Sequence, residues 1–250
     1  MKSPPVVPVG LEYVASALEK HDHEVSILDL CFSTDPQADL RDHLKAQVDL
    51  VGISIRNVDS AVYFNNEFFL PEIKDLIELL KNHGKTTILG GSGFSAMAQE
   101  ILEYLGADYG IMGPAEVAFP EFIRQWKEGL PKGKIMDGRN YGIADDIIHE
   151  RGKKIDYSRY LSENGIVGFE THVGCSHHCP YCVEAGKRVY FREVEQVIQE
   201  LRYLVEQGYN HFHLCDSEFN EDLDFTIQFC KRLIESELDL KWALYMKPSP

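Results

Sequence analysis

Hydrophobic positions in the first half of the chain follow two alternating spacings. Leu11, Val14, Ala15 and Leu18 recur every three or four residues, which predicts a helix with one buried face. Short apolar runs, such as the one at 49–55, predict buried strands. We predict further strands at 23–31, 86–91 and 107–112, and further helices at 40–47, 71–80, 97–105 and 116–127. Helices and strands that alternate in this way are typical of a parallel α/β sheet.

The same alternation returns after residue 164. Strands are predicted at 165–169, 211–216 and 240–246, with helices between them at 194–205 and 225–235. This β-α-β-α-β order is the opening half of a parallel barrel, a fold whose active sites lie at the carboxyl ends of the strands. The polar, glycine-containing residues between the two halves show no sustained period. We therefore expect an α/β domain at 1–125, a linker at 126–163 and an incomplete barrel domain at 164–250.

Charge and composition narrow the class of protein. The 40 acidic and 25 basic residues give a net charge of −15, which disfavours a nucleic-acid partner because the chain would repel a phosphate backbone. No apolar run of 18 residues suggests a membrane span, and no signal-peptide pattern opens the chain. We therefore expect a cytoplasmic protein with no membrane partner.

Three cysteines fall close together just after the predicted strand at 165–169. Cys175, Cys179 and Cys182 have the spacing C-x3-C-x2-C. Three thiolates can hold three irons of a [4Fe–4S] cluster and leave the fourth iron open, whereas a cluster that only carries electrons normally has four cysteines. A structural zinc site with a histidine as fourth ligand is a weaker alternative, because no second C-x2-C or H-x3-H pair is present. Buried free thiols are a third alternative, which the loop-forming Gly, Ser and Pro around the cysteines disfavour.

This cysteine spacing, with the aromatic Tyr181 just before the last cysteine, resembles the radical S-adenosylmethionine (SAM) superfamily. The resemblance implies that SAM binds the open iron, that Tyr181 packs against the adenine, and that reductive cleavage gives a 5′-deoxyadenosyl radical. It also implies a reductant such as flavodoxin or ferredoxin. Asp216, Ser217 and Glu218 match the position of the family's Gly-Gly-Glu segment, although no glycine pair is present. One of these three is expected to contact the amino group of SAM.

Ligands of an open parallel sheet bind at the carboxyl ends of its strands. In the first domain the residues expected there are Ser54, Arg56, Asn57, Gly90, Gly91, Gly113 and Glu116. The glycines at 90 and 91 would allow a bulky ligand to approach closely, or would simply turn the chain.

Together with the helix that follows Pro4-Pro5, these residues resemble the cobalamin-binding domain that precedes many radical SAM domains. The resemblance implies a flavodoxin/Rossmann-like α/β domain, followed by the first part of a radical SAM partial (β/α) barrel. It implies that Ser54, Gly90 and Gly91 line the nucleotide tail of cobalamin, and that Arg56 and Asn57 lie near the corrin. Gly113 and Glu116 match the family's Gly-x-Gly-Glu turn.

Three features depart from that family. The D-x-H-x-x-G motif, whose histidine binds cobalt in other cobalamin proteins, is absent. Pro114 stands where the family turn usually has glycine, so we expect a different turn if positive φ is needed there. The chain also begins at the loop that normally follows the first strand, so we expect a truncated chain, an N-terminal fragment, or another segment that fills the gap.

The resemblance implies a cobalamin-dependent radical SAM enzyme, most simply a methyltransferase that acts on an unactivated carbon through a 5′-deoxyadenosyl radical and methylcobalamin. A rearrangement or oxidative cyclisation without methyl transfer is an alternative, and so is a non-catalytic iron–sulfur or zinc protein. The substrate is expected to be a small molecule or a peptide. No catalytic acid or base is assigned, and we expect His211 and His213, which alternate on one strand, to be packed.

Overall fold

The structure is a computed structural model that describes residues 4–60, 62–64, 66–129, 131, 133–144, 147 and 150–248. The chain forms two compact units. Residues 26–142 form one unit, and residues 1–25 join residues 143–250 in the other. The first 25 residues therefore belong to the same unit as the second half of the chain. The predicted boundaries of the functional domains stay a prediction.

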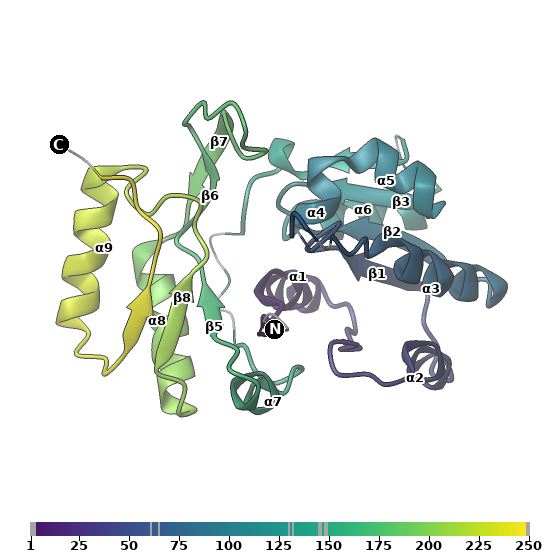
Figure 1. Ribbon diagram of the computed structural model, residues 1–250, viewed down its shortest axis with the longest axis horizontal. Helices are drawn as coiled ribbons and strands as arrows, with labels where there is room; N and C mark the ends of the chain where they lie inside the picture. The colour runs from purple at the N-terminus through teal and green to yellow at the C-terminus, as the bar shows by residue number, and fades with distance from the viewer. Residues whose placement is uncertain are drawn as a thin grey trace. The chain divides into compact units, whose positions relative to one another are not determined.

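The unit at 26–142 is built on a parallel sheet (Figure 1). Its strands pair in the order β1 (Leu50–Ser54), β2 (Thr86–Gly90), β3 (Tyr109–Met112) and β4 (Ile135–Asp137). The helices of this unit are α2 (Pro36–His43), α3 (Leu70–Asn82), α4 (Ser92–Ala96), α5 (Ala98–Leu105) and α6 (Ala118–Lys127), and a 3₁₀ turn follows at Gly138–Asn140. The predicted α/β class is confirmed, and each predicted helix is present with its ends shifted by a few residues.

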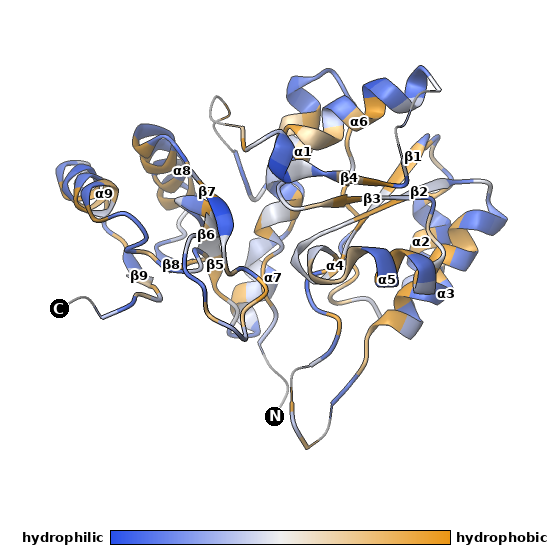
Figure 2. Ribbon diagram, turned by 90° about the horizontal axis from the view of Figure 1, so that it is seen from above, coloured by the Kyte–Doolittle hydropathy of each residue, from blue (hydrophilic) through white to orange (hydrophobic). Residues whose placement is uncertain are grey.

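Helices cover both faces of this sheet. Figure 2 shows α6 on one face and α3, α4 and α5 on the other. Ile77 of α3, Phe94 of α4 and Leu102 of α5 are buried with Leu89 of β2 in one apolar core. Because the two central strands are covered on both faces, neither contains a charged residue and their middle residues are buried, which is why they were predictable.

Two strand predictions need correction. Residues 23–31 form no strand. A strand needs a neighbour to accept its backbone hydrogen bonds, and no strand among the described residues pairs with this segment. Strand β1, predicted to be buried, lies at the edge of the sheet and is partly exposed. Within the predicted linker, residues 135–137 form β4, a strand too short for its periodicity to be recognised.

The second unit contains a three-stranded parallel sheet in the order β5 (Val167–Phe169), β8 (His211–Leu214) and β9 (Lys241–Ala243). Its helices are α1 (Val9–Lys20), α7 (Tyr157–Ser162), α8 (Val194–Glu206) and α9 (Leu223–Glu235). The predicted β-α-β-α-β order of the partial barrel is confirmed. A β-hairpin that we did not predict, β6 (His172–Cys175) with β7 (Lys187–Phe191), lies between β5 and α8.

Aromatic rings fill the space between this sheet and its helices. Phe169 of β5 and Phe212 of β8 are fully buried, and their ring centroids are 6.1 Å apart. Phe229 of α9 stacks on Phe169 at 6.4 Å. Figure 2 shows α8 and α9 together on this face of the sheet. The rings therefore fix which face of β5, β8 and β9 is buried and which is turned away from the helices.

A buried polar cluster attaches α1 to this unit. Arg151 pairs with Glu200 of α8 through Nε and Oε1 at 2.7 Å, and both side chains are almost completely buried. The hydroxyl of Tyr13 donates to the same oxygen at 2.9 Å. Glu12 accepts hydrogen bonds from the backbone of Gly152 and from the hydroxyl of Tyr157. Every carboxylate in the cluster therefore has a donor, which burial requires.

No helix in the described ranges is long and apolar enough to cross a membrane.

Replacing Arg151 should destabilise this unit strongly. Arg151→Met leaves the buried Glu200 carboxylate without its main partner, so we expect the free energy of unfolding to fall by about 3 kcal/mol or more. The matched control is Arg124→Met, which removes an exposed arginine that pairs with Glu121 and Glu128 and should change little. Urea denaturation followed by circular dichroism measures both, and equal effects would contradict the importance of the buried pair.

A second stability prediction concerns Gly110 of β3. A Cβ atom at this position would overlap the ring of Phe94, which is fully buried. Gly110→Ala should therefore lower the free energy of unfolding by about 1–3 kcal/mol. Gly10 in α1 has no heavy atom within 4 Å of its Cβ position, so Gly10→Ala should leave stability unchanged or raise it by about 0.5–1 kcal/mol. Denaturation curves that show no loss for Gly110→Ala would contradict the packing described.

Candidate functional site

The parallel register brings the predicted residues of the first sheet to one edge. Ser54 ends β1 and pairs with Gly90 at the end of β2, and Gly113 follows directly after β3. The side chains of Ser54, Arg56 and Asn57 are exposed. These residues are therefore available to a ligand at the carboxyl edge of the sheet, as the sequence predicts, whereas their roles stay predictions.

The two glycines at the end of β2 differ in the reason why glycine is needed there. A Cβ at Gly91 would lie 2.5 Å from the carbonyl oxygen of Ile55, and its φ is +97°. Gly91 is thus required by the close packing of two backbone segments, whether or not a ligand binds. Gly90 meets only Ile111 O at 3.8 Å, so space remains beside it.

The turn after β3 explains the unusual Pro114. Positive φ occurs at Gly113, with a value of +84°, and not at Pro114. The proline is therefore compatible with this turn because its φ remains negative. Glu116, three residues after Gly113, is buried.

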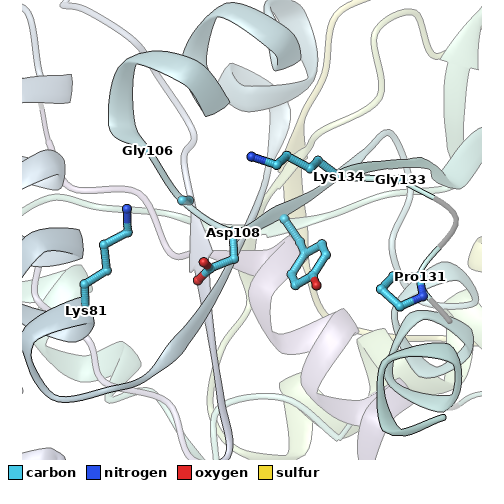
Figure 3. A pocket seen from close by; sticks show the side chains of 8 residues that line it. Lys81, Gly106, Asp108, Pro131, Gly133 and Lys134 are labelled. Atoms are coloured by element: carbon cyan, nitrogen blue, oxygen red, sulfur yellow. The ribbon is translucent and has the colours of Figure 1, made fainter. Parts of the chain in front are cut away.

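A cavity of about 500 Å³ lies at the opposite, amino-terminal edge of the sheet (Figure 3). Lys81 and Lys134 stand on either side of Gly106 and Asp108 in Figure 3. The Asp108 carboxylate accepts hydrogen bonds from Thr87 N at 2.8 Å and from Thr87 Oγ1 at 2.9 Å. These bonds link the residue before β3 to the start of β2, at the amino-terminal edge of the sheet. We do not place the ligand of the carboxyl edge in this cavity, because none of the predicted residues lines it.

The three predicted cluster cysteines lie in and beside the loop of the β6–β7 hairpin. Cys175 ends β6 and is buried, Cys179 is half-buried and Cys182 is exposed. The loop is shaped by backbone hydrogen bonds from Cys182 N to Cys179 O at 3.1 Å and from Gly186 N to His177 O at 2.7 Å. The side chains of the described residues are not already gathered as a closed metal site. The loop at the tip of the hairpin therefore carries three thiols, which as thiolates are soft ligands of the kind that iron–sulfur clusters and zinc prefer.

Glu221, which the sequence did not single out, anchors the first turn of this loop. Its Oε1 accepts a hydrogen bond from Ser176 N at 2.8 Å, and its Oε2 lies 3.8 Å from His177 Nε2. Burial by itself raises the pKa of the Glu221 carboxyl, but the Ser176 hydrogen bonds, Cys175 and His177 outweigh burial and leave the pKa below its usual value. Burial also raises the pKa of the Cys175 thiol, and Glu221 and Cys182 raise it further.

Asp216 holds the strand junction that precedes the cysteines. It is buried and accepts hydrogen bonds from Thr171 N at 2.7 Å and from the Thr171 hydroxyl. His172 Nδ1 lies 3.1 Å from Asp216 Oδ2. The Asp216 carboxylate is therefore occupied by the turn between β5 and β6. Of the three residues predicted to contact SAM, this geometry leaves Ser217 and Glu218 as the available ones.

Tyr181 is 88% exposed at the tip of the loop, so its ring face is open to a ligand. The neighbouring Cys179 raises the pKa of the Tyr181 phenol, and Cys182 and Glu218 add to the effect. The structure therefore brings Tyr181 and Glu218 together with two of the three cysteines. Glu221 could not be found from spacing alone, because it is 45 residues from Ser176 in the sequence.

Comparison with known proteins gives matches to a family model and to longer relatives. Residues 4–123 match the family model described as the B12 binding domain. The chain is 24% identical to tryptophan 2-C-methyltransferase from Streptomyces laurentii, over 99% of this chain and 54% of that protein. It therefore spans about half the length of this relative.

Solved structures show the same likeness. The radical S-adenosylmethionine methyltransferase TsrM from Kitasatospora setae, with cobalamin and a [4Fe-4S] cluster bound, superposes with a TM-score of 0.90 at 26% identity. The match covers 98% of this chain and 54% of that one. The same protein with tryptophan substrate and a SAM analogue bound gives a TM-score of 0.91 at 26% identity, over 98% of this chain and 53% of that one. By sequence and by fold, the chain is similar to a radical SAM methyltransferase that binds cobalamin and a [4Fe-4S] cluster, and a B12 binding domain match covers most of its first half.

Proposed function

We propose that the chain is the cofactor-binding part of a methyltransferase that uses cobalamin, a [4Fe–4S] cluster and SAM. The observation that carries this proposal is the three-cysteine loop at the tip of the β6–β7 hairpin, fixed by Glu221. It stands in the same chain as the B12 binding domain match. A structural zinc protein would need neither the exposed Tyr181 nor the open carboxyl edge of the first sheet.

The residues present fit the cluster and SAM. Cys175, Cys179 and Cys182 would hold three irons, and the missing fourth cysteine leaves one iron for SAM. When bound, the cluster and cobalamin supply the redox and methyl-carrying chemistry that side chains lack. The chain's own residues orient and bind: Tyr181 offers an open ring for the adenine, and Ser217 and Glu218 offer oxygens for the SAM ammonium.

The residues at the carboxyl edge of the first sheet fit a large flat ligand. Ser54 is exposed, and Gly90 leaves free space beside it, as a nucleotide tail requires. Arg56 and Asn57, also exposed, would lie near the corrin. Gly113 and Glu116 would shape the turn beside them, with Gly113 in positive φ.

The proposal extends to substrate, partner and location. The two relatives described above are named for, or bind, the small molecule tryptophan, which favours a small-molecule acceptor over a peptide. A one-electron donor such as flavodoxin or ferredoxin would reduce the cluster. The cytoplasm is the expected site, because it keeps cysteine thiols reduced. In this proposal the methyl transfer proceeds through a 5′-deoxyadenosyl radical. The product 5′-deoxyadenosine, which can be measured, would report that the radical had formed.

Anaerobic reconstitution tests the function. With iron, sulfide, hydroxocobalamin, methyl-labelled SAM and a low-potential reductant that supplies electrons to the cobalamin and the cluster, we expect about four irons per chain, a bound corrinoid, and label first on the corrinoid and then on a tryptophan acceptor. Cys182→Ala should lose most of the iron, whereas Cys31→Ala, which removes an exposed thiol of the other unit, should keep it. Absent iron or absent corrinoid would overturn the proposal. Cofactor binding with 5′-deoxyadenosine but no label in product would instead indicate a rearrangement or cyclisation.

The Glu221 anchor gives a further prediction. Glu221→Ala removes the acceptor for Ser176 N, so the cluster should be lost to a chelator about 10- to 100-fold faster, in keeping with the ~1.5–3 kcal/mol of a hydrogen bond to a charged group. Glu221→Gln keeps an acceptor oxygen and should lose less. The matched control is Glu184→Ala, because Glu184 lies in the same loop but pairs with Lys187. Visible absorbance during chelation measures all three, and equal rates for Glu221→Ala and wild type would contradict the anchoring.

A further inference from the structure

The segment between β1 and α3 forms a short hairpin, which we call the β1–α3 hairpin, with its base at 58–60 and 66–69. Asp59 and Phe68 pair as an antiparallel bridge, and Ser60 N donates a hydrogen bond to Glu67 O at 2.9 Å. Because β1 ends at the carboxyl edge of its sheet, the segment that follows it begins at that edge. The hairpin therefore starts beside the exposed residues that we propose to bind cobalamin.

The base of this hairpin is fixed by the protein itself. Val58 packs against the apolar core of the unit at 26–142, and Leu70, the first residue of α3, belongs to that core. The ring of Phe68 lies 5.9 Å from the ring of Tyr104 of α5. Asn66 Nδ2 also donates to Asp59 Oδ2 at 3.1 Å across the two legs. The base is thus held in place without any ligand.

The tip of the hairpin is apolar and exposed. It contains Val62, Tyr63 and Phe64, whose exposed fractions are 50%, 92% and 95%. Among the described residues, no other large apolar side chain is as exposed as Tyr63 and Phe64. Their rings contact each other edge to face, with centroids 5.0 Å apart. Apolar side chains scattered singly over a surface need no explanation, but consecutive ones at one tip indicate a binding surface.

The size of this tip favours a small ligand over a protein partner. Two aromatic rings bury roughly 300–500 Å² when they are covered. A stable protein interface buries about 800 Å² on each partner. Asp59 and Glu67 flank the tip, so charged residues bound the apolar surface on both legs. The tip therefore fits one flat apolar face better than it fits an extended protein surface.

The chemistry of the hairpin matches a corrin. A corrin macrocycle has broad apolar faces and a rim of carboxamide groups. Aromatic side chains pack well on such a face in offset or edge-on geometry. Arg56 and Asn57, which are exposed and directly precede the hairpin, offer hydrogen-bond donors and an amide oxygen that suit the rim. Apolar tip and polar neck thus correspond to the two parts of one ligand.

We propose that the tip of the β1–α3 hairpin packs against a face of the bound corrin, with Tyr63 and Phe64 as the rings in contact. The contact buries the two most exposed aromatic rings of the described chain and excludes water from that face of the corrin. This inference rests on the proposed methyltransferase function, which supplies the corrinoid. It adds two binding residues that the sequence did not single out.

Binding of hydroxocobalamin to the full chain, followed by visible absorbance, tests the contact. Phe64→Ala should weaken binding about tenfold or more, because burial of a phenylalanine ring contributes at least that factor. Phe64→Tyr keeps a ring and should bind nearly as wild type does. The matched control is Tyr245→Ala, which removes an exposed ring of the other unit and should change nothing. Cobinamide keeps the corrin and its amides but lacks the nucleotide tail, so Phe64→Ala should weaken its binding by the same factor.

Limited digestion with chymotrypsin gives a second readout, which needs no variant. The protease cuts after exposed aromatic residues, and loop tips are preferred sites of cleavage. The free protein should therefore be cut after Tyr63 or Phe64. Hydroxocobalamin in large excess over its Kd should slow this cut roughly tenfold or more, because it holds most chains in the covered state. A cut after Tyr245 in the other unit should keep its rate.

The outcomes separate this inference from the function on which it rests. A wild type that binds no corrinoid overturns both. If the wild type binds corrinoid, the inference alone is overturned by Phe64→Ala that binds as tightly, by a cut after Phe64 that cobalamin does not slow, or by a loss that cobinamide does not share, which would assign the tip to the nucleotide tail. Self-association that Phe64→Ala abolishes, with corrinoid binding unchanged, would identify a second copy of the chain as the occupant instead.

Discussion

Two carboxylates on the segment after β8 hold the cysteine loop to the partial barrel. Asp216 fixes the junction between β5 and β6 through Thr171, and Glu221 fixes the first turn of the loop through Ser176. Both are buried or nearly so, and both accept backbone N–H groups, so each bond is strengthened by a full charge. The other end of the β6–β7 hairpin is held by Phe191 of β7, whose ring packs against Phe225 of α9 at 4.5 Å. The positions of the three thiols and of the exposed Tyr181 depend on these contacts.

Much of the fold follows from spacing in the sequence, because helices and covered strands leave strong periodic signals. The helix stripes around Ile77 and Leu201 and the apolar run at Ile88 predicted α3, α8 and β2. The segment 23–31 has the composition of a strand but no partner, and composition alone cannot supply a neighbour. The β6–β7 hairpin was missed because its cysteine, glycine and basic residues do not alternate in polarity.

The site divides in the same way. Cys175, Cys179 and Cys182 could be proposed from the sequence because cluster ligation depends on short spacing within one loop. Glu221 and the buried Arg151–Glu200 pair were not, because their partners are distant in the sequence. Asp216 was found by its position at a strand end, but its bonds to Thr171 show that a strand-end carboxylate can serve the backbone instead of a ligand.

The buried cluster around α1 also sets an order of events during synthesis. Glu12 and Tyr13 find their partners 140 and 187 residues later, at Gly152 and Glu200. At about 5–20 residues per second, the ribosome needs roughly 10–40 s to add the 187 residues that separate Tyr13 from Glu200. The whole of residues 26–142 emerges in that interval with all of its sheet partners. The unit at 26–142 can thus complete its core first. Helix α1 stays without its buried partners until Glu200 of α8 has been synthesised.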